Sequence, residues 1–396
     1  MICYDDALCQ VLDTVVPLPP REISLTEAGG LVLATPARAK WDMPRCDNSA
    51  MDGFAVTGAP SADALLRIIG SSYAGHAFNG SLRADEAIRI TTGAPLPPGA
   101  DTIIPIEDVE EYDGQIRVTA APRACQHVRY RGEEYREGDI MVDVGTSLQA
   151  GEIAVLAGGG ITQVKVVPRP RIAVISTGDE LVELGTEPGH GQIVNSNQHL
   201  LCTRLSECGY DTVCLGIGND NLRNLQKLFE RALDADVIIS TGGVSVGDKD
   251  HVQAALETLG FIKKFWKVAI KPGKPLLFGL LNKKPYFGLP GNPAATAATL
   301  ELFALPALRK MAGWPDPQTS RRRGMLTSDV RCGGNRQTFL WCKLEWFEDQ
   351  YLVTVRQGQG SGQNRSIQGA NALLSVPVGT KWLMAGDMVD VQLINN

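Results

Sequence analysis

The stretch from Asp236 to Asp250 reads DVIISTGGVSVGDKD and decides the fold class of the chain. Its apolar run Val237–Ile239 is typical of a strand buried on both faces, as in a parallel sheet. A loop rich in glycine, hydroxyl and aspartate residues follows, and helix-like sequence begins at about His251. Because ligands of open α/β sheets bind outside the carboxyl ends of the strands, this loop suits an anion and a metal. An ordinary glycine-rich turn is the alternative that the stretch alone leaves open.

Strand-like and helix-like segments alternate around this stretch, from residue 171 to residue 310. The predicted strands are Ile172–Ser176, Thr212–Ile217, Val237–Ser240, Leu276–Gly279 and Tyr286–Gly288. The predicted helices are Ser196–Glu207, Leu222–Leu233, His251–Leu259 and Ala294–Lys310, the last opened by Pro293. This alternation predicts a three-layer α/β domain, with a parallel sheet covered by helices on both faces.

The flanking sequence predicts other kinds of structure. Residues 3–16 have the apolar spacing of an amphipathic helix, and residues 27–37 and 151–157 predict two shorter helices. Short β-like runs separated by turn residues lie between them, at 54–56, 87–90, 102–106 and 115–118. After a proline-containing stretch, further β-like runs predict a small barrel or sandwich. These runs lie at 338–344, 352–355, 373–376 and 388–393.

Together these segments predict a multidomain α/β protein with four domains. Residues 1–41 and 138–168 form a helical domain, into which a β domain of residues 42–137 is inserted. The α/β domain spans residues 169–316, and a β-barrel-like domain spans residues 317–396.

Composition argues against several classes of function. The formal net charge of −6 disfavours a nucleic-acid surface, because neutralising phosphates needs clustered Lys and Arg. No apolar stretch is long enough to cross a bilayer and residues 1–20 lack a basic n-region, so we expect no membrane partner and a cytoplasmic location. The nine cysteines form no C-x-x-C pair and the five histidines are scattered, which argues against zinc. Cys202 and Cys208, on a predicted helix, are expected to act as small buried hydrophobes.

Three further loops fall at strand ends where an α/β domain binds its ligand. Residues 176–181 (STGDEL) offer hydroxyls and carboxylates for phosphate and metal, with a capped turn as the alternative. Residues 267–275 (KVAIKPGKP) offer lysines on a loop stiffened by proline, with a solvated charge run as the alternative. Residues 288–293 (GLPGNP) precede the last helix, whose free N–H groups and dipole would attract an anion. Four such loops at neighbouring strand ends favour one shared site.

The inserted β region has a polar cluster of its own. Its segments are 47–54 (DNSAMDGF), 91–94 (TTGA) and 129–134 (RYRGEE). From composition alone, each segment fits a polar site and a solvated hairpin end about equally well.

Taken in order along the chain, these motifs resemble those of the molybdopterin molybdenumtransferase family. That family inserts the metal in molybdenum-cofactor synthesis and is similar to the E domain of gephyrin. The resemblance covers essentially the whole chain. Its motifs are DNSAMDGFAV, TTGAPLPPGAD, STGDEL, TGGVSVGDKD, FWKVAIKPGKP, LPGNP, QGSG and ANALLSVP.

The resemblance implies an elongated homodimer of four-domain subunits. Each active site would lie between the α/β domain of one subunit and the inserted β domain of the other. The implied substrates are molybdate and adenylylated molybdopterin, the products are molybdenum cofactor and AMP, and the implied metal is Mg²⁺. Further implied partners are the enzyme that adenylylates the pterin and the molybdoenzymes that accept the cofactor.

The resemblance also assigns roles to residues of this chain. A metal site is implied for Glu180, Asp220 and Asp250. Catalytic places are implied for Asp52, Thr92, Glu134, Lys267 and Lys271. The two lysines would hold molybdate or phosphate, and Asp52 with Thr92 would reach across from the second subunit. Substrate binding is implied for Ser176, Thr177, Gly178, Asp179, Gly242, Gly243, Ser245, Gly247, Asp248, Lys274, Pro290, Gly291, Pro293 and Ser361.

Two positions depart from the family pattern. The motif R-G-E-D reads RGEE and ends at Glu134, one methylene longer, which changes the reach of this carboxylate toward a metal. The motif R-x-x-F-x-R reads RQTFLW from Arg336 to Trp341, which removes a cationic contact; a change at the domain's outer surface is the alternative. A tungstate-inserting enzyme and a non-catalytic pterin carrier are alternative functions, and the two departures favour the carrier.

Overall fold

The computed structural model of the protein describes residues 1–219, 221–243 and 251–394. The chain forms two compact units, one of Met1–Arg21 with Val167–Asn396 and the other of Glu22–Val166. The division into four domains is finer than this, and its boundaries stay a proposal. No helix in the described ranges has the length and apolar character needed to span a membrane.

A six-stranded sheet forms the centre of the first unit, in the order β17-β14-β18-β22-β21-β19. These strands span Thr212–Gly218 (β17), Ile172–Thr177 (β14), Val237–Thr241 (β18), Lys284–Leu289 (β22), Leu277–Leu281 (β21) and Ile262–Trp266 (β19). β14 pairs in parallel with β17 and β18, and β18 pairs in parallel with β22. The carboxyl ends of these four strands therefore meet at one edge of the sheet.

The prediction of a wholly parallel sheet is wrong for β21, which lies beyond β22 in the strand order. β21 runs antiparallel to both β22 and β19. β21 and β22 form a hairpin whose turn residues Asn282 and Lys283 have φ of 48° and 66°. Two positive φ values give a turn that matches the twist of the flanking strands. Because this turn contains no glycine, the sequence carried only a weak signal for it.

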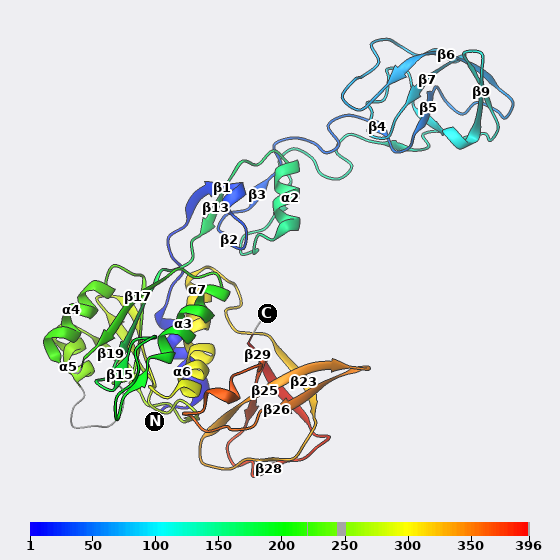
Figure 1. Ribbon diagram of the computed structural model, residues 1–396. Coiled ribbons are helices and arrows are strands. Elements are labelled where there is room, and N and C mark those ends of the chain that lie inside the picture. The colour runs from blue at the N-terminus through cyan, green and yellow to red at the C-terminus, as the bar shows by residue number, and fades with distance from the viewer. Residues whose placement is uncertain (220, 244–250, 395–396) are drawn as a thin grey trace. The chain divides into compact units, whose positions relative to one another are not determined.

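Helices cover both faces of the sheet, as predicted (Figure 1). One face carries α4 and α5, and the other carries α3, α6 and α7. Their bounds are Leu222–Ala232 (α4), His251–Thr258 (α5), Ser196–Glu207 (α3), Pro293–Thr299 (α6) and Leu305–Met311 (α7). A π-helical segment, η3 (Leu300–Ala304), joins α6 to α7, so the predicted closing helix contains a widened turn. Cys202 of α3 forms a disulfide with Cys214 of β17, which the sequence did not predict; Cys202 and Cys208 also pack, partly buried, against the apolar core.

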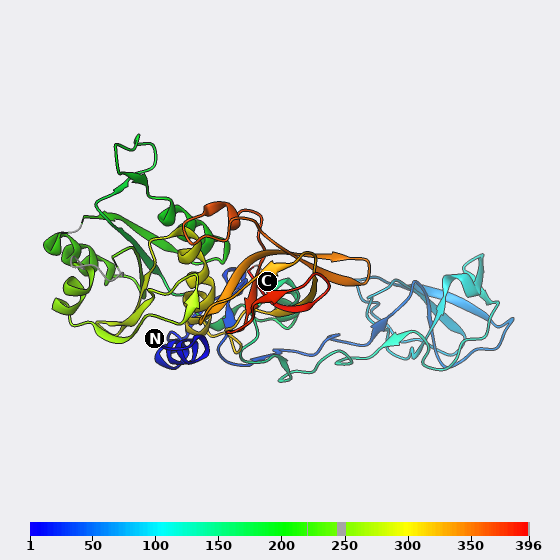
Figure 2. The same ribbon diagram turned by 90° about the horizontal axis from the view of Figure 1, so that it is seen from below.

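The N-terminal helix α1 (Tyr4–Thr14) confirms the predicted amphipathic helix and belongs to the first unit (Figure 2). Its apolar face joins the core formed by α3, α6 and α7. Tyr4 packs edge-on against Phe303 and Phe339, with ring centroids 5.5 and 5.0 Å away. Burial raises the pKa of Tyr4 to about 12. This helix therefore packs with the α/β domain, whereas the sequence grouped it with the helical domain.

The C-terminal part of the first unit is a closed β structure, as predicted. Its sheet runs β20-β25-β26-β23-β29-β27, and β27 also pairs with β25. The strands span Ile270–Lys271 (β20), Gln337–Phe347 (β25), Gln350–Val355 (β26), Arg321–Leu326 (β23), Met388–Leu393 (β29) and Ala372–Val376 (β27). β20 comes from the lysine-rich loop of the α/β domain and pairs in parallel with β25. This pairing ties the loop to the C-terminal domain.

The segments on either side of the inserted β region contain three paired strands and the predicted helix α2 (Ala150–Gly158). The strands are β1 (Arg21–Ser24), β13 (Gln163–Val167) and β2 (Val32–Leu33). The helix predicted for residues 27–37 is wrong. Only a short 3-10 turn ending at Glu27 forms there. Gly30 then adopts a φ of 72°, and the Leu33 N–H donates to the Thr146 carbonyl at 2.9 Å. Pairing with another segment therefore overrides the helical pattern.

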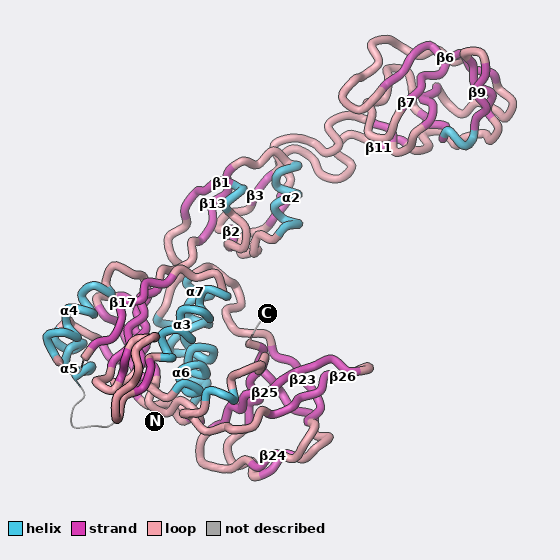
Figure 3. Tube along the Cα trace, in the orientation of Figure 1, coloured by secondary structure: helices cyan, strands magenta, loops and turns pink. Residues whose placement is uncertain are grey.

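The inserted β region is a six-stranded sheet in the order β8-β5-β7-β6-β10-β9. Its strands span Thr102–Pro105 (β8), Gly53–Val56 (β5), Glu86–Ile90 (β7), Leu65–Ser72 (β6), Gln115–Val118 (β10) and Val109–Tyr112 (β9). Strand and loop make up nearly all of this region (Figure 3). The four β runs predicted here are confirmed. β5, β7 and β8 alternate residues between two packed apolar clusters, and β10 places Ile116 and Val118 in one of them.

Candidate functional site

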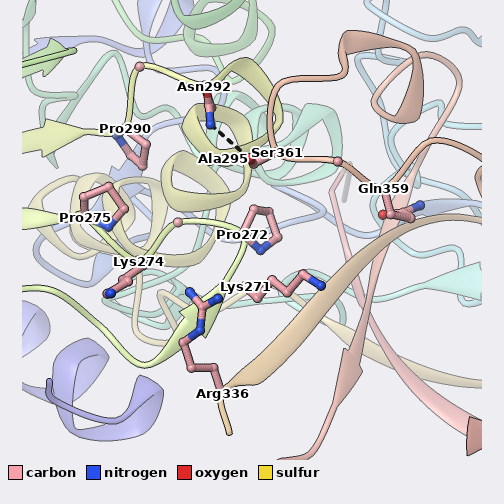
Figure 4. A pocket seen from close by; sticks show the side chains of 13 residues that line it. Lys271, Pro272, Lys274, Pro275, Pro290, Asn292, Ala295, Arg336, Gln359 and Ser361 are labelled. Atoms are coloured by element: carbon pink, nitrogen blue, oxygen red, sulfur yellow. Dashed lines mark hydrogen bonds between the residues drawn. The ribbon is translucent and has the colours of Figure 1, made fainter. Parts of the chain in front are cut away.

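A cavity of about 630 Å³ lies between the α/β domain and the C-terminal domain of the first unit (Figure 4). The lysine-rich loop lines it with residues 271–275, and the start of α6 lines it with residues 290–292 and 295. The C-terminal domain contributes Arg336 and residues 359–361. Two domains therefore build one cavity from segments far apart in the sequence.

Cationic side chains dominate this cavity. Figure 4 shows Lys271, Lys274 and Arg336 along one side and Asn292 with Ser361 along the other. The Arg336 Nη1 donates to the Ile270 carbonyl at 2.9 Å, which orients the guanidinium group. No acidic side chain is among the described residues that line the cavity. The cavity therefore suits a small anion with more than one negative charge.

The lysine-rich loop pairs with β25 and packs against α6 at the cavity wall. Lys271 pairs with Thr338 of β25, and the Lys271–Pro272 peptide bond is cis. Gly273 has a φ of 106°, and a Cβ there would lie 2.6 Å from the Thr299 Cγ2 of α6. Glycine is required at this position because the loop packs directly against the helix.

Lys267 does not join Lys271 at the cavity. Its Nζ lies over the ring of Trp266, 3.7 Å from the ring centroid, and its N–H donates to the Leu276 carbonyl at 3.1 Å. A cation over an aromatic face is attracted by the electrons of the ring. The role predicted for Lys267 therefore has no support from the geometry of this cavity.

The start of α6 is bridged to the C-terminal domain rather than left open for an anion. Pro293 has no N–H, and the Ala294 N–H donates to the Ser361 carbonyl at 3.0 Å. The side-chain amide of Asn292 donates to the Ser361 hydroxyl oxygen at 2.9 Å. The first N–H group of α6 is thus taken up by the C-terminal domain, while anion binding by the backbone of residues 288–292 stays a prediction.

The hydroxyl groups at the ends of β14 and β18 hold these strands together. The Thr177 hydroxyl donates to the Thr241 carbonyl at 3.1 Å, and the Thr241 hydroxyl donates to the Ser176 oxygen at 3.3 Å. Gly242 has a φ of 86°, and a Cβ there would lie 2.2 Å from the Thr177 carbonyl oxygen. A Cβ on Gly291 would lie 3.7 Å from the Gly242 Cα, so the two glycine loops meet. The predicted substrate contacts of Ser176 and Thr177 stay predictions.

The predicted metal ligands are only partly described. The exposed Glu180 follows β14, and its carboxylate folds back over Gly178, where an added Cβ would lie 2.5 Å from the Glu180 Oε2. Asp220, Ser245, Gly247, Asp248 and Asp250 lie outside the described residues. Within the described ranges, no three His, Cys, Asp or Glu side chains gather in a metal-binding arrangement. The residues that the structure describes therefore do not make up the predicted metal site.

The remaining predicted substrate contacts lie around the same strand ends. Asp179 is exposed next to Glu180, and Gly243 has a φ of 61°. Pro290 lines the cavity, and its carbonyl accepts a hydrogen bond from the Thr296 hydroxyl at 2.5 Å.

Asp52 and Thr92 form a polar pair in the second unit. The Thr92 N–H and hydroxyl donate to the same Asp52 Oδ1, at 2.7 and 2.9 Å. The backbone bond first, and the hydroxyl bond second, lower the pKa of the Asp52 carboxyl below its ordinary value. The structure therefore brings these two predicted residues together as an ionised, exposed carboxylate with its donor.

Glu134 lies in a separate loop of the second unit. Its N–H donates to the Met43 carbonyl at 3.0 Å, and its side chain is exposed. Its neighbour Glu133 instead accepts the Tyr130 N–H at 2.8 Å and shapes the turn. The longer side chain at position 134 therefore departs from the family pattern without disturbing the bonds that shape this loop.

Three polar residues of the cavity, Asn292, Arg336 and Gln359, were not assigned to the site from the sequence. Arg336 and Gln359 lie in the motifs R-x-x-F-x-R and QGSG, which could have identified them. Gln359 is held by the backbone of Trp341, which donates to its Oε1 at 3.1 Å and accepts from its Nε2 at 3.0 Å. Trp341 is only 2% exposed, so the alternative of a change at the outer surface is wrong.

Three family models match consecutive parts of the chain. Residues 2–160 match the MoeA N-terminal region (domain I and II), and residues 173–310 match a probable molybdopterin binding domain. Residues 323–394 match the MoeA C-terminal region (domain IV). The first of these matches contains the Asp52 and Thr92 pair, and the other two contain the residues that line the cavity.

Two molybdopterin molybdenumtransferases and one solved structure resemble the chain over most of its length. A molybdopterin molybdenumtransferase of Nostoc sp. is 36% identical over 388 residues, which cover 94% of this chain and 88% of the relative. That of Haemophilus influenzae is 36% identical, with 80% of each chain covered. A crystal structure of a molybdopterin biosynthesis MoeA protein from Pyrococcus horikoshii has a TM-score of 0.85 at 30% identity, and both chains are covered completely.

Proposed function

Because this chain belongs to the MoeA family and is a molybdopterin molybdenumtransferase of molybdenum-cofactor biosynthesis, we propose that the cavity of Lys271, Lys274 and Arg336 binds the molybdate that is inserted. The observation that supports this is the three cationic side chains, with no acidic group among the described lining residues. Molybdate is a small tetrahedral dianion, and charge-assisted bonds from ammonium and guanidinium groups are the strongest that the cavity offers. The neutral donors Asn292 and Ser361 would orient it.

The second substrate that we propose is adenylylated molybdopterin. Its dithiolene sulfurs would take up the metal, its phosphoanhydride would be cleaved, and AMP would leave. Gly242 and Gly291 lie side by side at the strand ends and suit close approach of such a ligand to the backbone. The lysines would contribute by holding molybdate next to the sulfurs, which replaces a bimolecular encounter by a positioned one.

A divalent cation, Mg²⁺, is proposed as a requirement of this reaction. When bound, it would neutralise the phosphate charges of the adenylylated pterin. Glu180 would supply one carboxylate, and Asp220 and Asp250, which lie outside the described residues, would supply the others. Chelation with EDTA is expected to abolish AMP release, and added Mg²⁺ is expected to restore it.

We further propose that the enzyme works as a homodimer with shared active sites. Asp52 and Thr92 lie in the second unit and are exposed, so they are available to a site completed by another subunit. The cytoplasmic location, the adenylylating enzyme as a partner and the cofactor-accepting molybdoenzymes stay predictions of the same kind.

The test is to incubate the purified protein with adenylylated molybdopterin, Mg²⁺ and molybdate, and to quantify AMP and metal-loaded pterin. We expect both products to appear only when molybdate is present. A parallel reaction with tungstate separates a molybdate-inserting from a tungstate-inserting enzyme. Tight pterin binding without AMP release in either reaction would contradict the proposed insertion and favour a carrier.

A further inference from the structure

We propose that Arg204 and Glu301 are positioning residues for metal insertion, because they fasten the C-terminal β domain to the α/β domain and so set the anion cavity between the two. Neither residue lines that cavity. The inference rests on the proposed function of the cavity and goes beyond it, since it concerns groups remote from the reacting atoms.

One guanidinium group joins three elements. Arg204, on α3, donates from Nε to the Glu301 Oε1 at 2.6 Å and from Nη2 to the Glu301 Oε2 at 3.4 Å. The same Nη2 donates to the carbonyl of Ile394, directly after β29. Its Nη1 donates to Glu207 at 3.3 Å. Arg204 therefore ties α3 and the π-helical segment η3 to the last strand of the C-terminal domain.

This arrangement depends on burial of the acid. The Glu301 side chain is 4% exposed and that of Arg204 is 13% exposed. Burial raises the pKa of the Glu301 carboxyl, and the bonds from Arg204 oppose this shift. A buried acid that loses its cation is strongly destabilising, whereas replacement of both charges by apolar groups is often nearly neutral. The effect of leaving the Glu301 carboxylate unpaired can therefore be separated by experiment from the effect of losing the connection between the two domains.

A continuous path of paired strands leads from this link to the anion cavity. β29 pairs with β27 at Leu393 and Ala372, and β27 pairs with β25 at Leu373 and Trp341. β25 then pairs with β20, which carries Lys271. The link to Ile394 therefore bears on the placement of the strand that presents a cavity lysine.

The test compares Arg204→Met with the double variant Arg204→Met/Glu301→Met. Both should raise the KM for molybdate by about tenfold or more with kcat changed less, because small displacements of positioning groups weaken productive binding strongly. The double variant should regain most of the melting temperature that Arg204→Met loses. Glu207→Gln, which removes only the exposed partner, is the matched control and should leave the KM unchanged.

The outcomes separate the possible roles. A double variant that regains both the melting temperature and the wild-type KM would overturn the positioning role and leave an ordinary ion pair. If Arg204→Met does not fold, Arg204→Lys is used instead, because it keeps the charge but loses the planar guanidinium that bonds Glu301 and Ile394 together. A raised KM for molybdate at a near-normal melting temperature then supports the proposal. A wild-type protein that shows no molybdate-dependent AMP release would instead contradict the proposed function itself.

Discussion

Asn292 and Ser361 are joined to each other on one side of the anion cavity, where the side-chain amide of Asn292 donates to the hydroxyl oxygen of Ser361 at 2.9 Å. Asn292 precedes α6 of the α/β domain, and Ser361 belongs to the C-terminal domain. The Ser361 carbonyl also accepts the Ala294 N–H at 3.0 Å. The neutral side of the cavity therefore exists only while the two domains are docked.

Ser361→Ala removes the side-chain acceptor of this link and keeps the backbone bond. Because a typical hydrogen bond contributes about 1 kcal/mol, we expect the KM for molybdate to rise by roughly three- to tenfold with little change in melting temperature. Steady-state kinetics at varied molybdate measures the effect. Ser328→Ala, at an exposed position of the same domain, is the control. Equal KM values for the two variants would show that the hydroxyl takes no part in binding.

Gly242→Ala should destabilise the protein more than Gly260→Ala. Both glycines have positive φ, 86° and 79°, so each substitution brings backbone strain of about 1 kcal/mol. Only at Gly242 would the new Cβ also meet backbone, 2.2 Å from the Thr177 carbonyl oxygen, whereas nothing lies within 4 Å at Gly260. Urea unfolding should therefore show that Gly242→Ala lowers the free energy of unfolding by about 2 kcal/mol more than Gly260→Ala does. Equal losses would mean that the glycine loop can move away from β14.

Thr92→Val should raise the pKa of Asp52 toward its ordinary value, since the variant keeps the N–H bond and loses the hydroxyl bond. A carboxyl whose pKa is lowered by folding contributes stability above its unfolded pKa and loses it as the pH falls through the folded pKa. The stability difference between wild type and variant should thus be present at neutral pH and vanish in acid. Carbon-13 NMR titration of the Asp52 carboxyl measures the shift, and an unchanged pKa would contradict the assignment.

Shared active sites predict complementation between two inactive variants. In a heterodimer of Asp52→Ala and Lys271→Ala subunits, one composite site would have both residues intact and the other would have neither. We therefore expect about half of the wild-type activity from a heterodimer isolated with two affinity tags. Each homodimer should be nearly inactive. An inactive heterodimer would place Asp52 and Lys271 in the same subunit's site.

Much of the fold could be predicted because buried strands contain continuous apolar runs, such as Val237–Ile239 of β18, and the helices have apolar faces. The antiparallel hairpin was missed because its turn, Asn282-Lys283, lacks the usual glycine. The helix predicted for residues 27–37 failed because pairing of Leu33 with a distant segment outweighs local preference. The family and the transferase activity are confirmed by relatives that match most of the chain.

The cavity itself could be predicted only in part. Lys271, Lys274 and Ser361 were assigned through motifs, but a motif does not tell which of its side chains face a common space. Lys267 was expected beside Lys271 and instead stacks on Trp266. Arg336 was noticed as a motif residue and not as a ligand, because its place depends on how β25 docks beside β20.

The most direct test of the molybdate site is the dissociation constant for molybdate, measured by calorimetry on wild type, Arg336→Ala and the control Lys263→Ala. Lys263 is an exposed lysine of β19 in the same unit and does not line the cavity. Because hydrogen bonds to charged groups contribute about 1.5–3 kcal/mol, we predict that molybdate binds at least about tenfold more weakly to Arg336→Ala and equally well to Lys263→Ala. Equal affinity of wild type and Arg336→Ala would contradict the assignment of the cavity to molybdate.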